Sequence, residues 1–216
     1  MIVTIGSTKG GVGKSTLAIN AAIARTIAGR RVWLIDADRQ GTSYLAMQAR
    51  AQAGHLPLID CDHLHEWERL EAEVSARAGD FDDVVIDAGG RDNAALRVAM
   101  LFSDRLVIPA APRAFDVWAL DDMLPLVDAV RQKNKRLEAR VMLSCADTVG
   151  KDNKGAREAL SAHPGIEYLD APVARRKAIG MAVAQGLSVL EFKPKDQKAI
   201  AEIQAFTRAI FTPLQP

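Results

Sequence analysis

The sequence predicts an α/β fold in which a doubly wound, mostly parallel sheet carries helices on both faces. Strand-like and helix-like patterns alternate along the whole chain, as in parallel strands joined by helical crossovers. The strand-like runs are continuously apolar, for example Val84-Val85-Ile86, which is typical of strands buried on both faces. With 216 residues, 49% hydrophobic and 25% charged, the chain can bury its own core. We therefore expect a single domain over residues 1–216.

The elements follow one another in a regular order. Strands or extended segments are expected at residues 2–7, 31–36, 55–62, 83–87, 105–109, 139–144 and 167–170. Helices are expected at residues 15–28, 42–53, 64–78, 93–102, 116–133, 153–163, 176–185 and 196–211. Gly29 stands where a helix C-terminal cap is common, whereas Pro125 falls inside a helical pattern and weakens it.

Composition narrows the possible functions. The 28 basic and 27 acidic residues give a net charge of +1, so binding to nucleic acid must depend on a local patch. The two cysteines, Cys61 and Cys145, cannot build a disulfide framework or a four-ligand metal site, which suits a reducing cytoplasm. No apolar run approaches the roughly 20 residues of a membrane helix, and we expect no membrane association.

A glycine-rich loop lies between the first strand and the first helix. Its backbone N–H groups can converge on anionic oxygens, and the helix N-terminus adds positive potential. We expect Lys14 to reach the β- and γ-phosphates of a nucleotide, and Ser15 to bind magnesium. The expected nucleotide-binding residues of the loop are Lys9, Gly10, Gly11, Val12, Gly13, Lys14, Ser15 and Thr16. The predicted cofactors of this loop are a nucleoside triphosphate and Mg²⁺.

Three aspartates follow strands that should end beside this loop. Asp36 and Asp38 come at the end of the second strand, and Asp87 closes the run 84–87. Ligands of doubly wound sheets bind beyond the carboxyl ends of the strands, so we expect all three carboxylates at the phosphate site. Asp87 can hold magnesium through water. Alternatively, Asp36 and Asp38 cap the following helix.

These motifs resemble those of the ParA/MinD family of ATPases. The string Lys-Gly-Gly-x-Gly-Lys-Ser-Thr is similar to the family's deviant Walker A loop, and Asp36-x-Asp38 to its second acidic motif, with Arg39 in place of the usual proline. The resemblance implies that Lys9 crosses a dimer interface to the partner's nucleotide. It also implies that Asp38 activates the attacking water, and that Asp36 helps to hold the hydrated magnesium. The implied catalytic residues are Lys9, Lys14 and Asp38, and the metal ligands Ser15, Asp36 and Asp87.

The resemblance extends toward the C-terminus. Pro109, Pro112 and Asp116 match a family segment beside the nucleotide, and Ser144 stands where an adenine-reading asparagine is frequent. The string Gly-x-Ser-Val-x-Glu at residues 186–191 also resembles the family.

A partition ATPase of the short ParA type is the function that the resemblance implies. Its ATP-bound homodimer would bind DNA without sequence preference, and a small ParB-like or other cargo-adaptor partner would stimulate hydrolysis. Such a protein would be cytoplasmic and nucleoid-associated, and would segregate or position a plasmid or other cargo. The candidate DNA-binding residues are Arg175, Arg176, Lys177, Lys193 and Lys195. A solvated charged surface is the alternative explanation for them.

Other functions on the same fold remain open. A MinD-like membrane-cycling ATPase would need a C-terminal amphipathic helix with a basic face, but Arg208 is the only basic residue in the segment 202–211. A small-molecule ATP-dependent synthetase would need a second substrate pocket. An iron–sulfur reductase subunit would need bridging cysteines.

Overall fold

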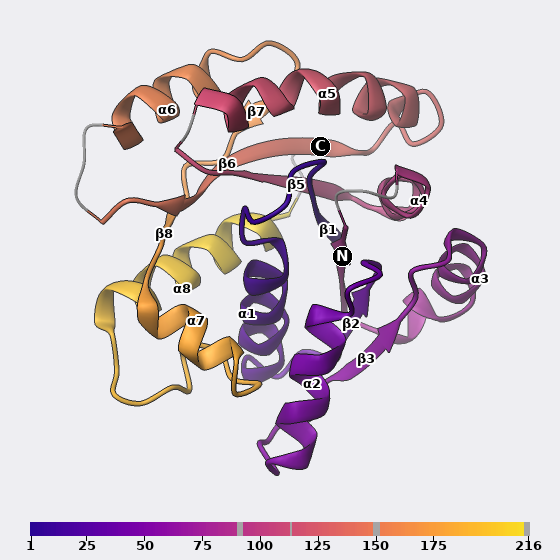
Figure 1. Cartoon of the computed structure of the whole chain (residues 1–216). Coiled ribbons are helices and arrows are strands. Elements are labelled where there is room, and N and C mark those ends of the chain that lie inside the picture. The colour runs from indigo at the N-terminus through magenta and orange to yellow at the C-terminus, as the bar shows by residue number, and fades with distance from the viewer. Residues whose placement is uncertain (90–92, 113, 149–151, 214–216) are drawn as a thin grey trace.

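The strands form one parallel sheet in the computed structural model, which describes residues 1–89, 93–112, 114–148 and 152–213 (Figure 1). The strand order is β3-β2-β4-β1-β5-β6-β7, and β8 also pairs with β6. The strands are β1 (Ile2–Gly6), β2 (Val32–Asp36), β3 (Asp60–His63), β4 (Asp83–Ala88), β5 (Arg105–Ala110), β6 (Glu138–Ala146), β7 (Glu167–Tyr168) and β8 (Val173–Ala174). The helices are α1 (Lys14–Ile27), α2 (Thr42–Gln52), α3 (Trp67–Arg77), α4 (Asn93–Phe102), α5 (Ala114–Arg131), α6 (Asp152–Ser161), α7 (Lys177–Val183) and α8 (Gln197–Phe211), with a 3₁₀ turn at Ala78–Asp80.

Helices cover both faces of the sheet, which confirms the predicted fold class. One apolar core lies under α1, α2, α7 and α8, and the other under α3, α4, α5 and α6 (Figure 1). Successive strand residues serve opposite cores: Val85 of β4 joins the first, whereas Val84 and Ile86 join the second.

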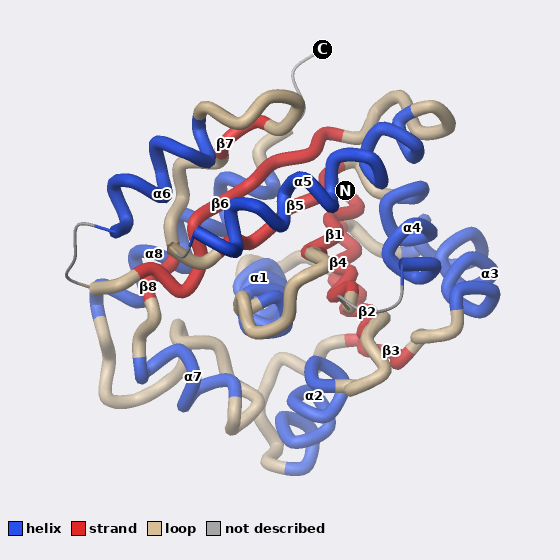
Figure 2. The backbone as a smooth tube through the Cα atoms, turned by 45° about the horizontal axis from the view of Figure 1, so that its top comes forward, coloured by secondary structure: helices blue, strands red, loops and turns tan. Residues whose placement is uncertain are grey.

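The order of the strands reverses at β1. From β1 the chain proceeds to β2 on one side, and after β4 it crosses to β5 on the other side of β1. The carboxyl end of β1 is therefore a topological switch point, where ligands of such sheets bind. The loop that leaves β1 passes in front of the N-terminus of α1 at this point (Figure 2).

Some element boundaries differ from the sequence-based expectation. β8 is a two-residue strand that no pattern predicted, and α3 begins at Trp67 rather than at residue 64. Residue 64 remains extended because the Leu64 amide donates a 2.8 Å hydrogen bond to the Asp36 carbonyl. α5 continues through Pro125, and its buried residues Leu120, Met123 and Val127 attach both sides of the proline to the core.

The C-terminal helix α8 belongs to the core. Ile203, Phe206 and Ile210 are fully buried against the core that includes α1. Buried Arg105 donates hydrogen bonds of 3.1, 2.7 and 3.1 Å to the carbonyls of Ala209, Ile210 and Thr212, which satisfies the open end of the helix. Among the described residues, no helix is both long and apolar enough to cross a bilayer.

Candidate functional site

The loop between β1 and α1 has the backbone geometry of a phosphate cradle. Gly11 and Gly13 have φ angles of 75° and 87°, in the left-handed region that favours glycine. Gly13 is the N-cap residue of α1, and a Cβ there would lie 3.1 Å from Ser144 Oγ and 3.3 Å from Cys145 Sγ. The loop is thus closely packed against the end of β6, and its sharp turn places the N-terminus of α1 at the switch point.

Lys14 projects from the first turn of α1 and is only 8% exposed. Its ammonium donates a 2.7 Å hydrogen bond to the Lys9 carbonyl. Burial lowers the pKa of Lys14, while the nearby carboxylates of Asp87 and Asp38 oppose that shift. A partly desolvated cation that faces carboxylates across the loop is suited to binding phosphate oxygens.

Lys9 lies at the tip of the loop with a half-exposed side chain. Two contacts of its main chain hold the loop: its amide donates to Ser7 Oγ at 3.2 Å and its carbonyl accepts from Lys14. Therefore, the side chain of Lys9 is not required for these two contacts.

Asp36 and Asp87 are direct neighbours, at paired positions of β2 and β4. The carboxylate of Asp36 is fully buried and accepts 3.0 Å hydrogen bonds from the amides of Asp38 and Tyr44. Burial raises the pKa of Asp36, and these amides oppose the shift. Asp36 thus organises the turn that leads into α2, as the capping alternative proposed.

Asp87 is buried with one carboxylate oxygen unsatisfied. Its Oδ2 accepts a 2.6 Å hydrogen bond from Ser43 Oγ, while its buried Oδ1 has no partner within the described residues. Burial, followed by the negative charge of Asp36, raises the pKa of Asp87 to about 7, although Ser15, Ser43 and Lys14 oppose the shift. A divalent cation would relieve this pairing of buried carboxylates.

The residues at this position fit Mg²⁺. The unsatisfied oxygen of Asp87 and the hydroxyl of Ser15 are the hard ligands that this ion prefers. Both oxygens of Asp36 are engaged by amides, so Asp36 would act on the water shell of the ion. No group of three or more His, Cys, Asp or Glu side chains within the described ranges could hold a metal ion. Phosphate oxygens and water would thus complete the coordination.

Asp38 lies directly against Gly89, which follows β4. Its Oδ1 accepts a 3.1 Å hydrogen bond from the Gln40 amide. A Cβ placed on Gly89 would lie 2.6 Å from both Cγ and Oδ2 of Asp38. Because residue 89 has no side chain, the carboxylate of Asp38 has room at the rim of the sheet.

We expect Gly89→Ala to lower ATP turnover by about 10²-fold, because a methyl group there must displace the Asp38 carboxylate by about 1 Å. ATP affinity should change little, since the glycine loop and Lys14 are not touched. Gly79→Ala is the matched control, as its Cβ would meet no atom within 4 Å. Titration with a fluorescent ATP analogue and single-turnover hydrolysis would measure the two quantities. Normal turnover by Gly89→Ala would disprove the expectation that hydrolysis depends on the placement of Asp38.

The remaining predicted nucleotide contacts lie in or after β5, in β6 and in α5. Pro109 pairs with Met142 inside the sheet, and Pro112 follows the strand. The buried hydroxyl of Ser144 lies beside Gly13, close to the phosphate loop. Asp116 belongs to α5, but its side chain lies outside the described residues.

Sequence reasoning missed three side chains that shape the site. Ser43 bonds to Asp87, His63 bonds to the Asp38 carbonyl, and Arg50 ties α2 to Glu191. For His63, the one available signal was its place at the end of the strand-like segment that follows the one carrying Asp36.

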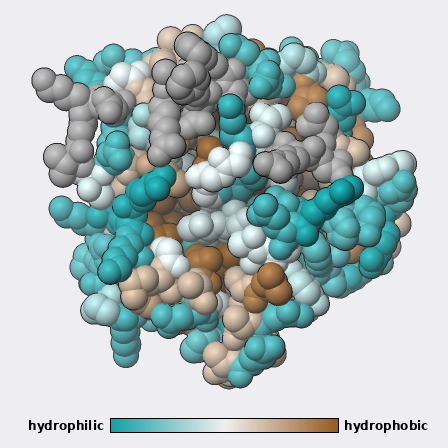
Figure 3. Space-filling view, viewed as in Figure 1, coloured by the Kyte–Doolittle hydropathy of each residue, from teal (hydrophilic) through white to brown (hydrophobic). Residues whose placement is uncertain are grey.

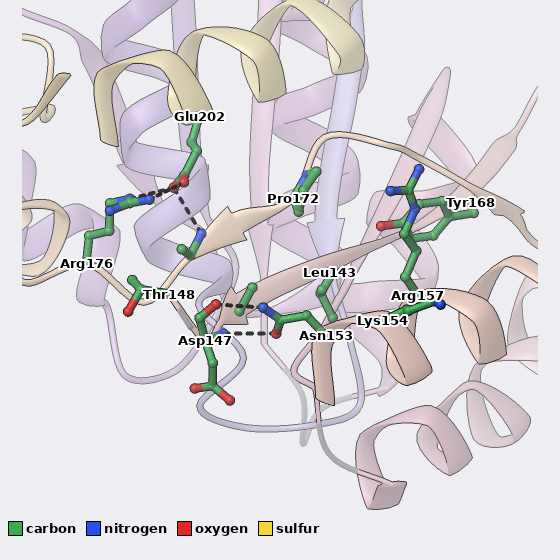
Figure 4. Close-up of a pocket in the computed structure, with 12 residues that line it drawn as sticks. Leu143, Asp147, Thr148, Asn153, Lys154, Arg157, Tyr168, Pro172, Arg176 and Glu202 are labelled. Carbon is green, nitrogen blue, oxygen red and sulfur yellow. Dashed lines mark hydrogen bonds and ion pairs between the residues drawn. The ribbon is translucent and has the colours of Figure 1, made fainter. Parts of the chain in front are cut away.

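The predicted DNA-binding residues differ in their surroundings. Arg176 is half-buried and donates hydrogen bonds of 2.9 and 2.6 Å to the two carboxylate oxygens of Glu202. This pair lines a cavity of about 320 Å³ between the end of β6, β8 and α6 (Figure 4). No residue of the phosphate loop lines that cavity. The other four predicted residues are exposed: Arg175, Lys177, Lys193 and Lys195.

Comparison with known proteins identifies relatives along most of the chain. The family model described as "CobQ/CobB/MinD/ParA nucleotide binding domain" matches residues 3–189. The chain is 26% identical over 202 residues to "Maintenance of carboxysome distribution protein A" of Halothiobacillus neapolitanus, covering 92% of this chain and 91% of the relative. It is 30% identical over 204 residues to the protein of the same name from Gloeobacter kilaueensis, with 91% and 87% covered.

A solved structure shares the fold. The putative plasmid partition protein of Borrelia burgdorferi, bound to AMPPNP, superposes with a TM-score of 0.72 at 20% identity, covering 96% of this chain and 97% of the other.

Proposed function

Because this chain belongs to the CobQ/CobB/MinD/ParA family of nucleotide-binding domains, we propose that it is a Mg²⁺-dependent ATPase that positions cargo. One observation carries the proposal: Lys14, Asp36, Asp38 and Asp87 meet at the switch point beside a loop with phosphate-binding geometry. Two ATP molecules would be enclosed between two copies of the chain.

Each residue of the site has its own role in the proposed binding and hydrolysis of ATP. The amides of residues 10–13 and the Lys14 ammonium hold the phosphates, with Thr16 near the α-phosphate and Ser144 near the base. Ser15 and Asp87 would hold Mg²⁺, which would supply positive charge to the phosphate oxygens. Asp38 orients the attacking water, and Lys9 of one copy reaches the nucleotide of the other.

DNA binding would follow from dimerisation. Arg175, Lys177, Lys193 and Lys195 are exposed and near one another in the sequence, and a dimer doubles the number of phosphates that they can neutralise. Arg176 contributes less, because Glu202 neutralises its guanidinium. The ATP-bound dimer would associate with the nucleoid in the cytoplasm.

The cargo and its adaptor are proposed by similarity. The named relatives maintain carboxysome distribution, and the similar structure is a putative plasmid partition protein. We propose that a small ParB-like or other adaptor carries the cargo and stimulates hydrolysis, which releases the ATPase from DNA.

The surface and the C-terminal helix favour this function over membrane cycling. The apolar face of α8 is buried in the core, so it is not free to enter a bilayer. In the view of Figure 3 the margins are mostly hydrophilic, and less polar surface lies toward the centre, over α1 and α2. Less polar surface with a charged margin is compatible with a contact between two copies.

The test is retention on DNA of arbitrary sequence at fixed moderate salt with ATP, ADP or no nucleotide. We expect the protein to be retained on DNA with ATP, but not with ADP or without nucleotide. The variant Arg175→Ala/Lys177→Ala should reduce the slope of log affinity against log salt by about 3 to 4 per dimer, because four cations are lost. Lys133→Ala/Lys135→Ala, which removes two exposed lysines after α5, is the control. Equal retention under all three nucleotide conditions would refute the proposed switch.

A further inference from the structure

We propose that His63 is a positioning residue that fixes the Asp38 turn for ATP hydrolysis. The inference rests on the proposed function, in which Asp38 acts on the attacking water. It assigns a role to a histidine that no sequence motif singled out.

The contact between His63 and the turn is direct. His63 is the last residue of β3 and is paired with Asp36 of β2. Its Nε2 lies 2.8 Å from the Asp38 carbonyl oxygen. Because a carbonyl oxygen only accepts, Nε2 must carry the proton and donate it. The hydrogen bond thereby fixes which ring nitrogen is protonated.

The Asp38 carbonyl is also the structural centre of the turn. It accepts a second, 3.0 Å hydrogen bond from the amide of Gly41, which closes residues 38–41 into a turn. Gly41 has a φ of 64°, and a Cβ there would lie 3.3 Å from the His63 Cε1 atom. His63 therefore both bonds to the start of the turn and packs against its end.

Neighbouring rings hold His63 in this orientation. The ring of Tyr44 stacks on it with centroids 5.8 Å apart and an interplanar angle of 23°. The ring of His65 packs against it at a tilt of 34°, with centroids 4.8 Å apart. The Tyr44 amide donates to Asp36, so the stack is tied to the other carboxylate of the loop.

Asp38 is consequently constrained from two directions. His63 holds its main chain, and Gly89 leaves just enough room for its side chain. Neither contact involves the phosphate loop. Loss of the His63 donor should let the turn shift, which would misplace the carboxylate without weakening nucleotide binding.

The test compares His63→Phe, which keeps a flat ring but loses the donor, with His63→Gln, which retains a donor. We expect His63→Phe to bind a fluorescent ATP analogue within about twofold of wild type while single-turnover hydrolysis falls by about 10- to 100-fold. We expect His63→Gln to regain part of that rate. His163→Phe is the control, because that half-buried ring contacts Asp121 and the Pro164 carbonyl.

A double variant separates positioning from general damage to the fold. If His63 acts through Asp38, adding His63→Phe to Asp38→Ala should slow hydrolysis no further, since the group that it positions is already absent. The inference is overturned if His63→Phe hydrolyses ATP at the wild-type rate, or if it lowers the rate equally in both backgrounds. By contrast, the proposed function itself would be refuted if Asp38→Ala hydrolysed ATP as fast as the wild type.

Discussion

Replacing Lys9 with alanine is expected to lower ATP hydrolysis by about 10³-fold or more while ATP binding persists. A cation delivered across an interface to transition-state charge has an effect of this size in related phosphoryl transfers. The loop should survive the substitution, because the hydrogen bonds of Lys9 to Ser7 and Lys14 are made by its amide and its carbonyl. Lys14→Ala, by contrast, removes the buried ammonium and should abolish nucleotide binding itself.

Mixing two severely impaired variants tests whether Lys9 acts on the partner's nucleotide. In a Lys9→Ala and Asp38→Ala heterodimer, the site on the Lys9→Ala chain has its own Asp38 and receives Lys9 from the other chain. An equal mixture should thus recover about one quarter of the wild-type turnover, because half of the dimers are mixed and each has one complete site. Each variant alone should show only its slow residual turnover. A mixture as slow as its components would argue that Lys9 acts within its own chain or not at all.

The sequence predicted the fold and the phosphate loop because both are encoded locally. Apolar runs such as Val84-Val85-Ile86 identify strands by themselves. Glycines at positions 11 and 13 indicate a backbone with positive φ angles, which other residues rarely adopt. The short β8 had no such signal. Its two residues become a strand only because β6 lies beside them, with the Arg175 amide donating to the Ala146 carbonyl.

The supporting contacts of the site could not be predicted because they join distant residues. Ser43 and Asp87 are 44 positions apart, and Arg50 and Glu191 are 141 apart. Each side chain is unremarkable in its own segment. The resemblance at residues 186–191 pointed to this region without giving its physical role, which the structure supplies: Ser188 donates to Asn20 of α1, and Glu191 accepts from Arg50 of α2.

Arg50 is a buried residue that links α2, the helix after Asp36 and Asp38, to the C-terminal segment that contains Glu191. It is 1% exposed, and it donates hydrogen bonds of 2.9 and 2.8 Å to the two oxygens of Glu191. Its guanidinium also donates to the carbonyls of Pro57 and Gly186 at 2.9 and 3.0 Å. Gly186 must be glycine here, because its φ is 69° and a Cβ would lie 2.5 Å from the Arg50 amide nitrogen.

Breaking this pair from either side should destabilise the protein, but unequally. Glu191→Met leaves the guanidinium buried without a counter-charge, for which we expect a loss of about 3–5 kcal/mol in the free energy of unfolding. Arg50→Met should cost less, about 3 kcal/mol, because the Glu191 side chain is 18% exposed and can turn toward water. The exposed pair Arg157–Asp170, with side chains 55% and 58% exposed, is the control, and Arg157→Met should cost less than about 1 kcal/mol.

Urea unfolding of the single variants and of Arg50→Met/Glu191→Met measures these differences. The double variant should be less destabilised than the sum of the single ones, because it leaves no buried charge unpaired. The order of the two single variants is the sharper test, since the loss of an attractive pair contact alone would cost the same from either side. If Arg50→Met proved the more harmful, the carbonyls of Pro57 and Gly186, rather than the charge of Glu191, would be the partners that make Arg50 necessary.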